Sequence, residues 1–146
     1  MNAPFKLMAL WLIGFLFFTV LDLLWIGVVA APVYRAEVGS LLVLGEGMSA
    51  IRIVAAVITW LLITLSLVSF ATPHLSPSVA VALARGALMG LVIYGVYDLT
   101  NFAVLRGWTL KVTVLDIVWG TVVCASTGVV IYWASQWIDS APQGTQ

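Results

Sequence analysis

Four long apolar segments constrain the fold of this chain more than any other feature. They run from Leu7 to Ala31, from Ile53 to Ala71, from Val79 to Leu105 and from Val112 to Ile138. A helix needs about 20 apolar residues to cross the hydrocarbon core of a bilayer. The strands of a membrane barrel would instead appear as short alternating stretches, which this sequence lacks. The pattern therefore predicts an all-α integral membrane bundle of four transmembrane helices. Residues 1–139 form its single domain, and residues 140–146 form a short polar tail.

Composition supports a membrane location. Hydrophobic residues make up 63% of the 146 residues and charged residues only 8%, against roughly 25% charged in soluble domains. A chain of this length has too little interior to bury this apolar surface. Membrane lipids are therefore the expected neighbours of the apolar side chains. The net charge is zero and no basic run occurs, which argues against a nucleic-acid partner. The first segment is too long for a cleaved signal peptide and contains Asp22, which indicates a retained helix.

The cations predict an orientation. We define the loop face by the 33–50 and 106–111 loops, and the terminal face by both chain ends and the 72–78 loop. The loop face carries Arg35, Arg52, Arg106 and Lys111, and the terminal face carries Lys6 and Arg85. Cytoplasmic loops of membrane proteins have an excess of Lys and Arg. This count predicts a cytoplasmic loop face and periplasmic termini.

Three carboxylates lie within the apolar segments: Asp22, Asp98 and Asp116. A carboxylate at the bilayer centre costs at least ~2.5 kcal/mol, so such residues normally face the interior of a bundle. Because successive helices alternate in direction, all three fall in the leaflet next to the loop face. Three carboxyl groups packed together cannot all remain ionised at low cost, so we expect at least one to be protonated unless a cation pairs with it.

Residues three or four positions apart share a helix face, which predicts the neighbours of these carboxylates. The predicted ligand-binding pocket comprises Asp22, Trp25, Tyr94, Tyr97, Asp98, Asn101, Asp116 and Trp119. Three cations are placed to act as counter-charges at its mouth: Arg52, Arg106 and Lys111. The same polar side chains are equally consistent with hydrogen bonds that only hold the helices together.

Other patterns carry less functional information. The small-residue rows predict close helix packing; they consist of Ala82, Gly86 and Gly90, and of Gly120, Cys124 and Gly128. The only histidine, His74, lies on the terminal face, far from the carboxylates, which argues against zinc or haem. No metal site is therefore predicted, although the carboxylates and Asn101 also suit a hard divalent cation. No motif indicates a cofactor.

The sequence also contains a weak internal repeat. Val20-Leu21-Asp22-Leu23 resembles Val96-Tyr97-Asp98-Leu99. In the second and fourth segments a cation precedes a tryptophan by eight positions, as Arg52 precedes Trp60 and Lys111 precedes Trp119. These matches predict two related hairpins, an arrangement that some transporters use.

Three short motifs resemble domain-of-unknown-function family 2177, a family of four-helix bacterial membrane proteins. The motifs are Leu21-Asp22-Leu23-Leu24-Trp25-Ile26-Gly27, Tyr94-Gly95-Val96-Tyr97-Asp98-Leu99-Thr100-Asn101 and Leu115-Asp116-Ile117-Val118-Trp119-Gly120. The resemblance covers nearly the whole chain and implies a bacterial inner-membrane location. It implies no activity, substrate or cofactor.

We expect a membrane protein whose pocket of carboxylates and aromatic rings binds a small or amphipathic ligand or protons, and transport of that ligand is an extension of the same interpretation. A small hydrophobic or cationic molecule fits such a pocket. Two alternatives stay open: a membrane-embedded enzyme that uses Asp as acid and base on a lipid-soluble substrate, and a structural or assembly subunit. The expected protein partners are accordingly copies of itself or components of a larger membrane complex.

Overall fold

The protein is a bundle of helices. The structure, a computed structural model, describes residues 3–43, 47–71 and 76–140; His74 and residues 141–146 of the predicted tail lie outside these ranges. Four helices in the described ranges are long and apolar enough to cross a membrane. They are α1 (Ala3–Leu24), α3 (Ala50–Ala71), α4 (Val79–Val104) and α5 (Leu110–Ser140). The described residues contain no strand, so the predicted all-α class is confirmed.

The segment after α1 differs from the prediction of a single helix that ends at Ala31. The regular α-helix ends at Leu24, and a π-helical turn, η1 (Trp25–Val29), follows it. The Ala30 N–H closes this turn by donating to the Trp25 carbonyl at 2.8 Å. A second helix, α2 (Ala31–Val38), and a 3₁₀ turn, η2 (Gly39–Leu41), follow. Pro32 fits the first turn of α2 because the N–H that proline lacks has no helical partner there.

Helices α4 and α5 form a tight antiparallel hairpin. Their turn contains Gly107, whose φ of 87° suits glycine. The two rows of small residues face each other, and a Cβ atom added to Gly90 would lie 2.2 Å from the Gly120 carbonyl oxygen. Backbones this close leave no space for a side chain, so the rows serve packing as predicted.

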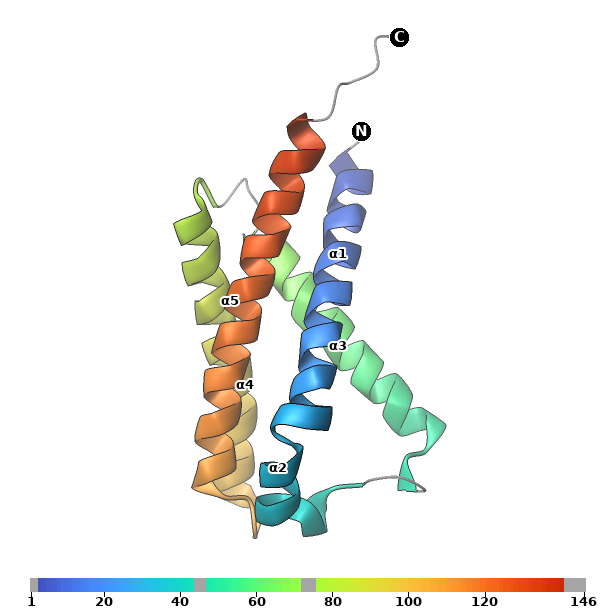
Figure 1. The fold of residues 1–146 in the computed structure, drawn as a ribbon, viewed down its shortest axis with the longest axis vertical. Coiled ribbons are helices and arrows are strands. Elements are labelled where there is room, and N and C mark those ends of the chain that lie inside the picture. The colour runs from blue at the N-terminus through green and yellow to red at the C-terminus, as the bar shows by residue number, and fades with distance from the viewer. Residues whose placement is uncertain (1–2, 44–46, 72–75, 141–146) are drawn as a thin grey trace.

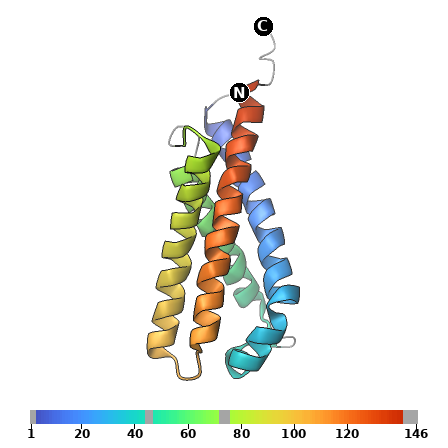
Figure 2. The ribbon, with the colours of Figure 1, turned by 60° about the vertical axis from the view of Figure 1, so that its left-hand side comes forward.

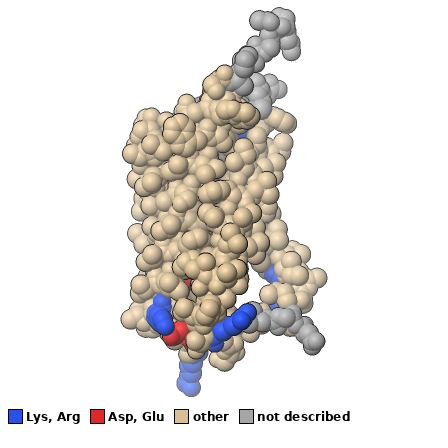
Figure 3. All heavy atoms as spheres, in the orientation of Figure 1, with Lys and Arg blue, Asp and Glu red and all other residues tan. Residues whose placement is uncertain are grey.

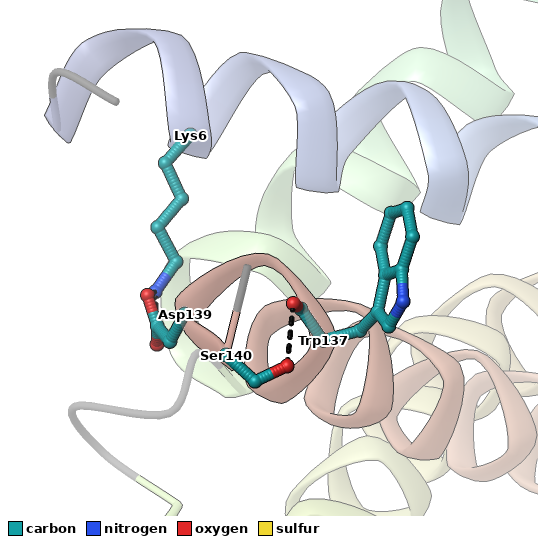
Figure 4. Close-up of polar contacts among 4 residues, drawn as sticks. All are labelled: Lys6, Trp137, Asp139 and Ser140. Carbon is teal, nitrogen blue, oxygen red and sulfur yellow. Dashed lines mark hydrogen bonds and ion pairs between the residues drawn. The ribbon is translucent and has the colours of Figure 1, made fainter. Parts of the chain in front are cut away.

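Helix α5 lies at the centre of the bundle, with α1 and α4 on either side of it (Figure 2). The Lys6 ammonium on α1 pairs with the Asp139 carboxylate on α5 at 2.6 Å and joins the two helices at the terminal face (Figure 4). Beside this pair, the Ser140 hydroxyl donates to the Trp137 carbonyl at 2.9 Å. The core between these helices and α3 includes Leu10, Phe18, Leu67, Val123 and Ile131.

Helix α3 crosses the bundle obliquely, and its N-terminal end diverges from the other helices (Figure 1). Its buried residues are confined to Ile63, Thr64, Leu67 and Val68, whereas every residue from Ala50 to Thr59 is exposed. The visible middle of the molecule is almost free of charge, and charged side chains gather toward the loop face (Figure 3). The packed half of α3 therefore closes one side of the bundle near Asp22, and the other half stands apart.

Candidate functional site

Asp22, in the last turn of α1, is the acceptor at the centre of an aromatic cluster. Its side chain is only 7% exposed. The Trp119 indole N–H donates to Oδ1 at 2.9 Å, and the Trp60 indole N–H donates to Oδ2 at 2.9 Å. The Tyr94 hydroxyl is at the limit of hydrogen bonding, 3.5 Å from Oδ1. Helices α3, α4 and α5 thus each contribute one aromatic side chain to a carboxylate on α1.

The position of Tyr94 depends on a glycine of the neighbouring helix. A Cβ atom at Gly120 would lie 2.1 Å from the Tyr94 ring. No side-chain carbon can occupy that position without displacing the ring. Gly120 therefore lets the Tyr94 ring lie directly against the backbone of α5, one residue from Trp119, and the two aromatic groups reach the same carboxylate.

A second polar cluster surrounds Asp116 on α5. The Tyr34 hydroxyl on α2 hydrogen-bonds Oδ1 of Asp116, and the Trp25 indole N–H donates to the Tyr34 hydroxyl oxygen at 3.2 Å. Burial, the hydrogen bond to Asp116 and the charge of that carboxylate raise the pKa of Tyr34 above its ordinary value of 10.0. The phenol therefore keeps its proton at neutral pH and remains a donor.

Asp98 on α4 lies against this second cluster. Its side chain is 0% exposed, and its carboxyl group is within hydrogen-bonding reach of Asp116. No N–H or O–H group of a described residue donates to either Asp98 oxygen. Two ionised carboxylates are both acceptors, so a direct bond between Asp98 and Asp116 requires a proton on one of them.

Stacked indoles connect the two clusters. The rings of Trp25 and Trp119 are parallel, with centroids 4.3 Å apart. Trp119 belongs to the Asp22 cluster through its N–H, and Trp25 belongs to the Asp116 cluster through Tyr34. The structure thus joins the three intramembrane carboxyl groups in one network of polar and aromatic contacts.

A cavity of about 360 Å³ opens beside Asp22. Its walls come from α1, α3 and α4 and consist of Asp22, Thr59, Trp60, Leu62, Ile63, Ile93, Tyr94 and Tyr97. Tyr97 is 60% exposed and makes an edge-to-face contact with Trp108. Asp98 and Asp116 do not line the cavity. Only the Asp22 cluster is therefore directly accessible to a ligand that occupies it.

Lys111, one of the predicted counter-charges, pairs with a carboxylate outside the predicted pocket. Its ammonium pairs with Glu37 of α2 at 3.0 Å, and this contact, with a hydrogen bond from Thr109, holds the pKa of the Glu37 carboxyl below its ordinary value of 4.5. The side chains of Arg52 and Arg106 form no hydrogen bond or ion pair with any residue that the structure describes. The described residues thus place no cation on Asp22, Asp98 or Asp116.

The amide of Asn101, one turn beyond Asp98, has a buried Nδ2 without a hydrogen-bond acceptor among the described residues. Within the same ranges, no three acidic, histidine or cysteine side chains converge closely enough to hold a metal ion. Two of the predicted pocket residues, Tyr97 and Asn101, thus have side chains that form no hydrogen bond with a described residue.

The family described as "predicted membrane protein (DUF2177)" matches residues 7–133. The chain belongs to this family. No curated protein and no solved structure matches the chain. As a DUF2177 member with four candidate spanning helices, the chain is a multi-pass membrane protein. The match includes all three carboxyl groups and both clusters around them.

Two residues that hydrogen-bond the carboxyl groups, Trp60 and Tyr34, are absent from the pocket predicted from the sequence. The internal repeat contained a signal for Trp60, because it pairs Trp60 with Trp119, and these two indoles donate to opposite oxygens of Asp22. Tyr34 lies in the stretch predicted as a loop, but in the structure it belongs to α2. Its contact with Asp116 depends on the path of the chain through η1 and α2.

Proposed function

We propose that this protein binds an amphipathic cation in the cavity beside Asp22, with the cationic group against the carboxylate. The observation that carries the proposal is a buried carboxylate, open to a cavity, whose partners among the described residues are neutral aromatic groups. Two indole N–H groups stabilise the negative charge of Asp22 without cancelling it. A ligand cation can therefore still be attracted to that charge, and the attraction is strong in a medium of low dielectric constant.

The cavity walls support the same ligand class. Trp60, Tyr94 and Tyr97 present aromatic rings beside the carboxylate, and aromatic faces attract organic cations. Leu62, Ile63 and Ile93 provide apolar walls for a hydrocarbon portion. The volume of about 360 Å³ falls within the range of small-molecule sites, roughly 300–1,000 Å³.

The location of the cavity gives the ligand a route from the bilayer. Its lining residues on α3 and α4 include the exposed Thr59, Leu62 and Tyr97. Amphipathic cations partition into membranes, where a lateral opening is accessible to them. As part of the proposal, the membrane is the bacterial inner membrane and the loop face is cytoplasmic, which places the site in the cytoplasmic leaflet.

The acid–base alternative has less support because of access. Asp98 and Asp116 lie close enough to share a proton, but neither lines the cavity, and Asp98 is completely buried. A substrate in the cavity would meet Asp22 alone. We therefore assign the Asp22 cluster to binding and the Asp98–Asp116 pair to the polar network that supports it.

The test is binding of dodecyltrimethylammonium to the purified protein in nanodiscs, followed by calorimetry. The neutral probe is dodecanol, which has the same chain without the charge. Asp22→Asn keeps the shape and one acceptor oxygen, so we expect a folded protein that binds the cation at least about tenfold more weakly. Dodecanol should bind both proteins equally.

Asp139→Asn is the matched control, because it removes a carboxylate at the terminal face, far from the cavity. We expect this variant to bind dodecyltrimethylammonium as the wild-type protein does. Equal affinity of the wild-type and Asp22→Asn proteins for the cation would overturn the proposal. Thermal unfolding of each variant establishes that the comparison concerns folded protein.

A further inference from the structure

The N-terminal half of α3, residues Ala50–Thr59, is exposed on all of its sides. No residue in this range is buried, and Ile51 is 77% exposed. Burial begins only at Trp60 and Ile63, where the helix meets the bundle. Figure 1 shows the reason: α3 and α1 diverge toward the loop face, so this half of the helix leans away from its neighbours. We call it the exposed half of α3.

The exposed half of α3 is apolar apart from Arg52 and Thr59. Successive residues turn by about 100° around a helix, so Ile51, Ile53, Val54, Val57 and Ile58 cover roughly half of its circumference. Among spanning helices, one face usually packs against a partner. In this half no residue is buried against a described neighbour, so its apolar side requires hydrocarbon contact. The neighbouring end of α1 and η1 is also apolar and exposed, at Leu24, Ile26, Val28 and Val29.

The charge at the loop-face end of this helix selects the kind of molecule that lies there. Arg52 is exposed in the first turn of α3, and its guanidinium forms no hydrogen bond or ion pair with a described residue. In the described ranges, the loop face has one carboxylate, Glu37, and Lys111 already pairs with it. The guanidinium of Arg52 is therefore available to an anion. Its fork of N–H donors matches the oxygens of a phosphate.

We propose that the exposed half of α3 is a binding site for an anionic phospholipid. The phosphate contacts Arg52, and an acyl chain lies along α3 on the side that faces α1. The dimensions agree: α3 rises about 12 Å between Arg52 and Trp60, and half of a bilayer's hydrocarbon core is about 15 Å thick. The acyl chain would thus end beside Thr59, which lines the Asp22 cavity.

Charge also favours a lipid over a second copy of the chain as the occupant. A copy in the same orientation would bring its own Arg35, Arg52 and Arg106 to the same face, and like charges repel. An anionic lipid supplies the opposite charge and hydrocarbon together, in its ordinary orientation in the membrane. This site is separate from the proposed cation site, because it requires Arg52 and does not require Asp22.

The experiment measures lipid binding to the full-length protein in a neutral detergent by native mass spectrometry. The probes are dioleoyl phosphatidylglycerol and dioleoyl phosphatidylcholine, which differ in net charge and share the same chains. We expect the wild-type protein to bind phosphatidylglycerol preferentially. Arg52→Gln should lose most of this preference, with about fivefold weaker binding of phosphatidylglycerol and unchanged binding of phosphatidylcholine.

Arg106→Gln is the matched control, because it removes an equally unpaired cation from the α4–α5 turn on the same face. It should bind phosphatidylglycerol as the wild-type protein does. Equal losses in the two variants would indicate diffuse attraction and overturn the site, as would the absence of a preference for phosphatidylglycerol. Both variants should keep the wild-type unfolding temperature in phosphatidylcholine nanodiscs.

A second variant tests the alternative occupant. Val57→Cys, in a Cys124→Ala background, places a thiol in the middle of the exposed half of α3. With lipid at this surface, we expect little disulfide-linked dimer in phosphatidylglycerol vesicles after mild oxidation. Near-complete crosslinking would show that a second copy covers the surface and would overturn the proposal. The result is independent of Asp22, so it distinguishes failure of this site from failure of the cation site.

Discussion

The indole of Trp25 stacks on that of Trp119 with a centroid separation of 4.3 Å and an angle of 2° between the planes. The two N–H groups then diverge to different acceptors, Tyr34 and Asp22. Each ring is therefore held both by the stack and by its own hydrogen bond. Substitutions of Trp25 or Trp119 can therefore separate the contribution of the stack to stability from the contribution of the hydrogen bond.

Trp119→Phe keeps an aromatic ring for the stack and removes the N–H donor to Asp22. We expect the free energy of unfolding to fall by about 1 kcal/mol, a value within the range measured for hydrogen bonds inside membranes. Steric trapping in bicelles measures it. Trp137→Phe serves as the control because Trp137 is 75% exposed, and it should have no effect. Similar losses in both variants would contradict the assigned hydrogen bond.

Gly120→Ala places a Cβ atom 2.1 Å from the Tyr94 ring. The ring or the helix must move, so we expect a loss of about 1–3 kcal/mol in the free energy of unfolding, together with weaker binding of dodecyltrimethylammonium. Gly95→Ala is matched in chemistry, and its Cβ atom meets no atom within 4 Å. That variant should be as stable as the wild-type protein or slightly more stable. A harmless Gly120→Ala would show that Tyr94 is not held in this position.

Asp98→Asn should be tolerated. Its amide can donate an N–H to Asp116, whereas two carboxyl groups can bond only when one carries a proton. We expect the free energy of unfolding to stay within about 0.6 kcal/mol of the wild-type value. Asp98→Ala removes both donor and acceptor from a fully buried position and should cost about 1–3 kcal/mol. Equal costs for the two variants would argue against a direct contact between positions 98 and 116.

The Glu37–Lys111 ion pair predicts a pH effect on α2. The pKa of Glu37 is below its ordinary value of 4.5 because of Lys111 and Thr109. The pair therefore stabilises the docked α2 fully above pH 4.5, and this contribution is lost as the pH falls through the lowered pKa. A spin label at Ser40 should become more mobile over that acidic range. Lys111→Gln should move the Glu37 titration, followed by NMR, upward toward 4.5, and Arg106→Gln should leave it in place.

The orientation is testable with single cysteines in a Cys124→Ala background. Ser40 and Ser140 are both exposed, near the loop face and at the terminal end of α5. If the loop face is cytoplasmic, as the distribution of cations predicts, an impermeant maleimide should label Ser140→Cys on intact cells and should label Ser40→Cys only after lysis. The reverse pattern would invert the orientation.

The predicted spans agree with the observed helices because the signal for a membrane helix is local. Each backbone hydrogen bond lies within its own segment, and length and hydropathy suffice to locate α3, α4 and α5 within a few residues of their bounds. The end of α1 was less predictable. Its apolar run continues to Ala31, and composition does not distinguish an α-helical turn from the π-helical turn of η1.

The sequence by itself determined that four helices cross the membrane and that three carboxyl groups belong to them. The tertiary structure decided the partners of these groups. Spacing along one helix pairs Asp22 with Trp25, but the bonds to Asp22 come from Trp60 and Trp119, on two other helices. These contacts depend on how each helix is rotated and tilted against its neighbours. That rotation follows from close packing, such as Gly90 against Gly120. Spacing within one segment can show which of its faces packs closely, but it does not specify which residues of another helix that face meets.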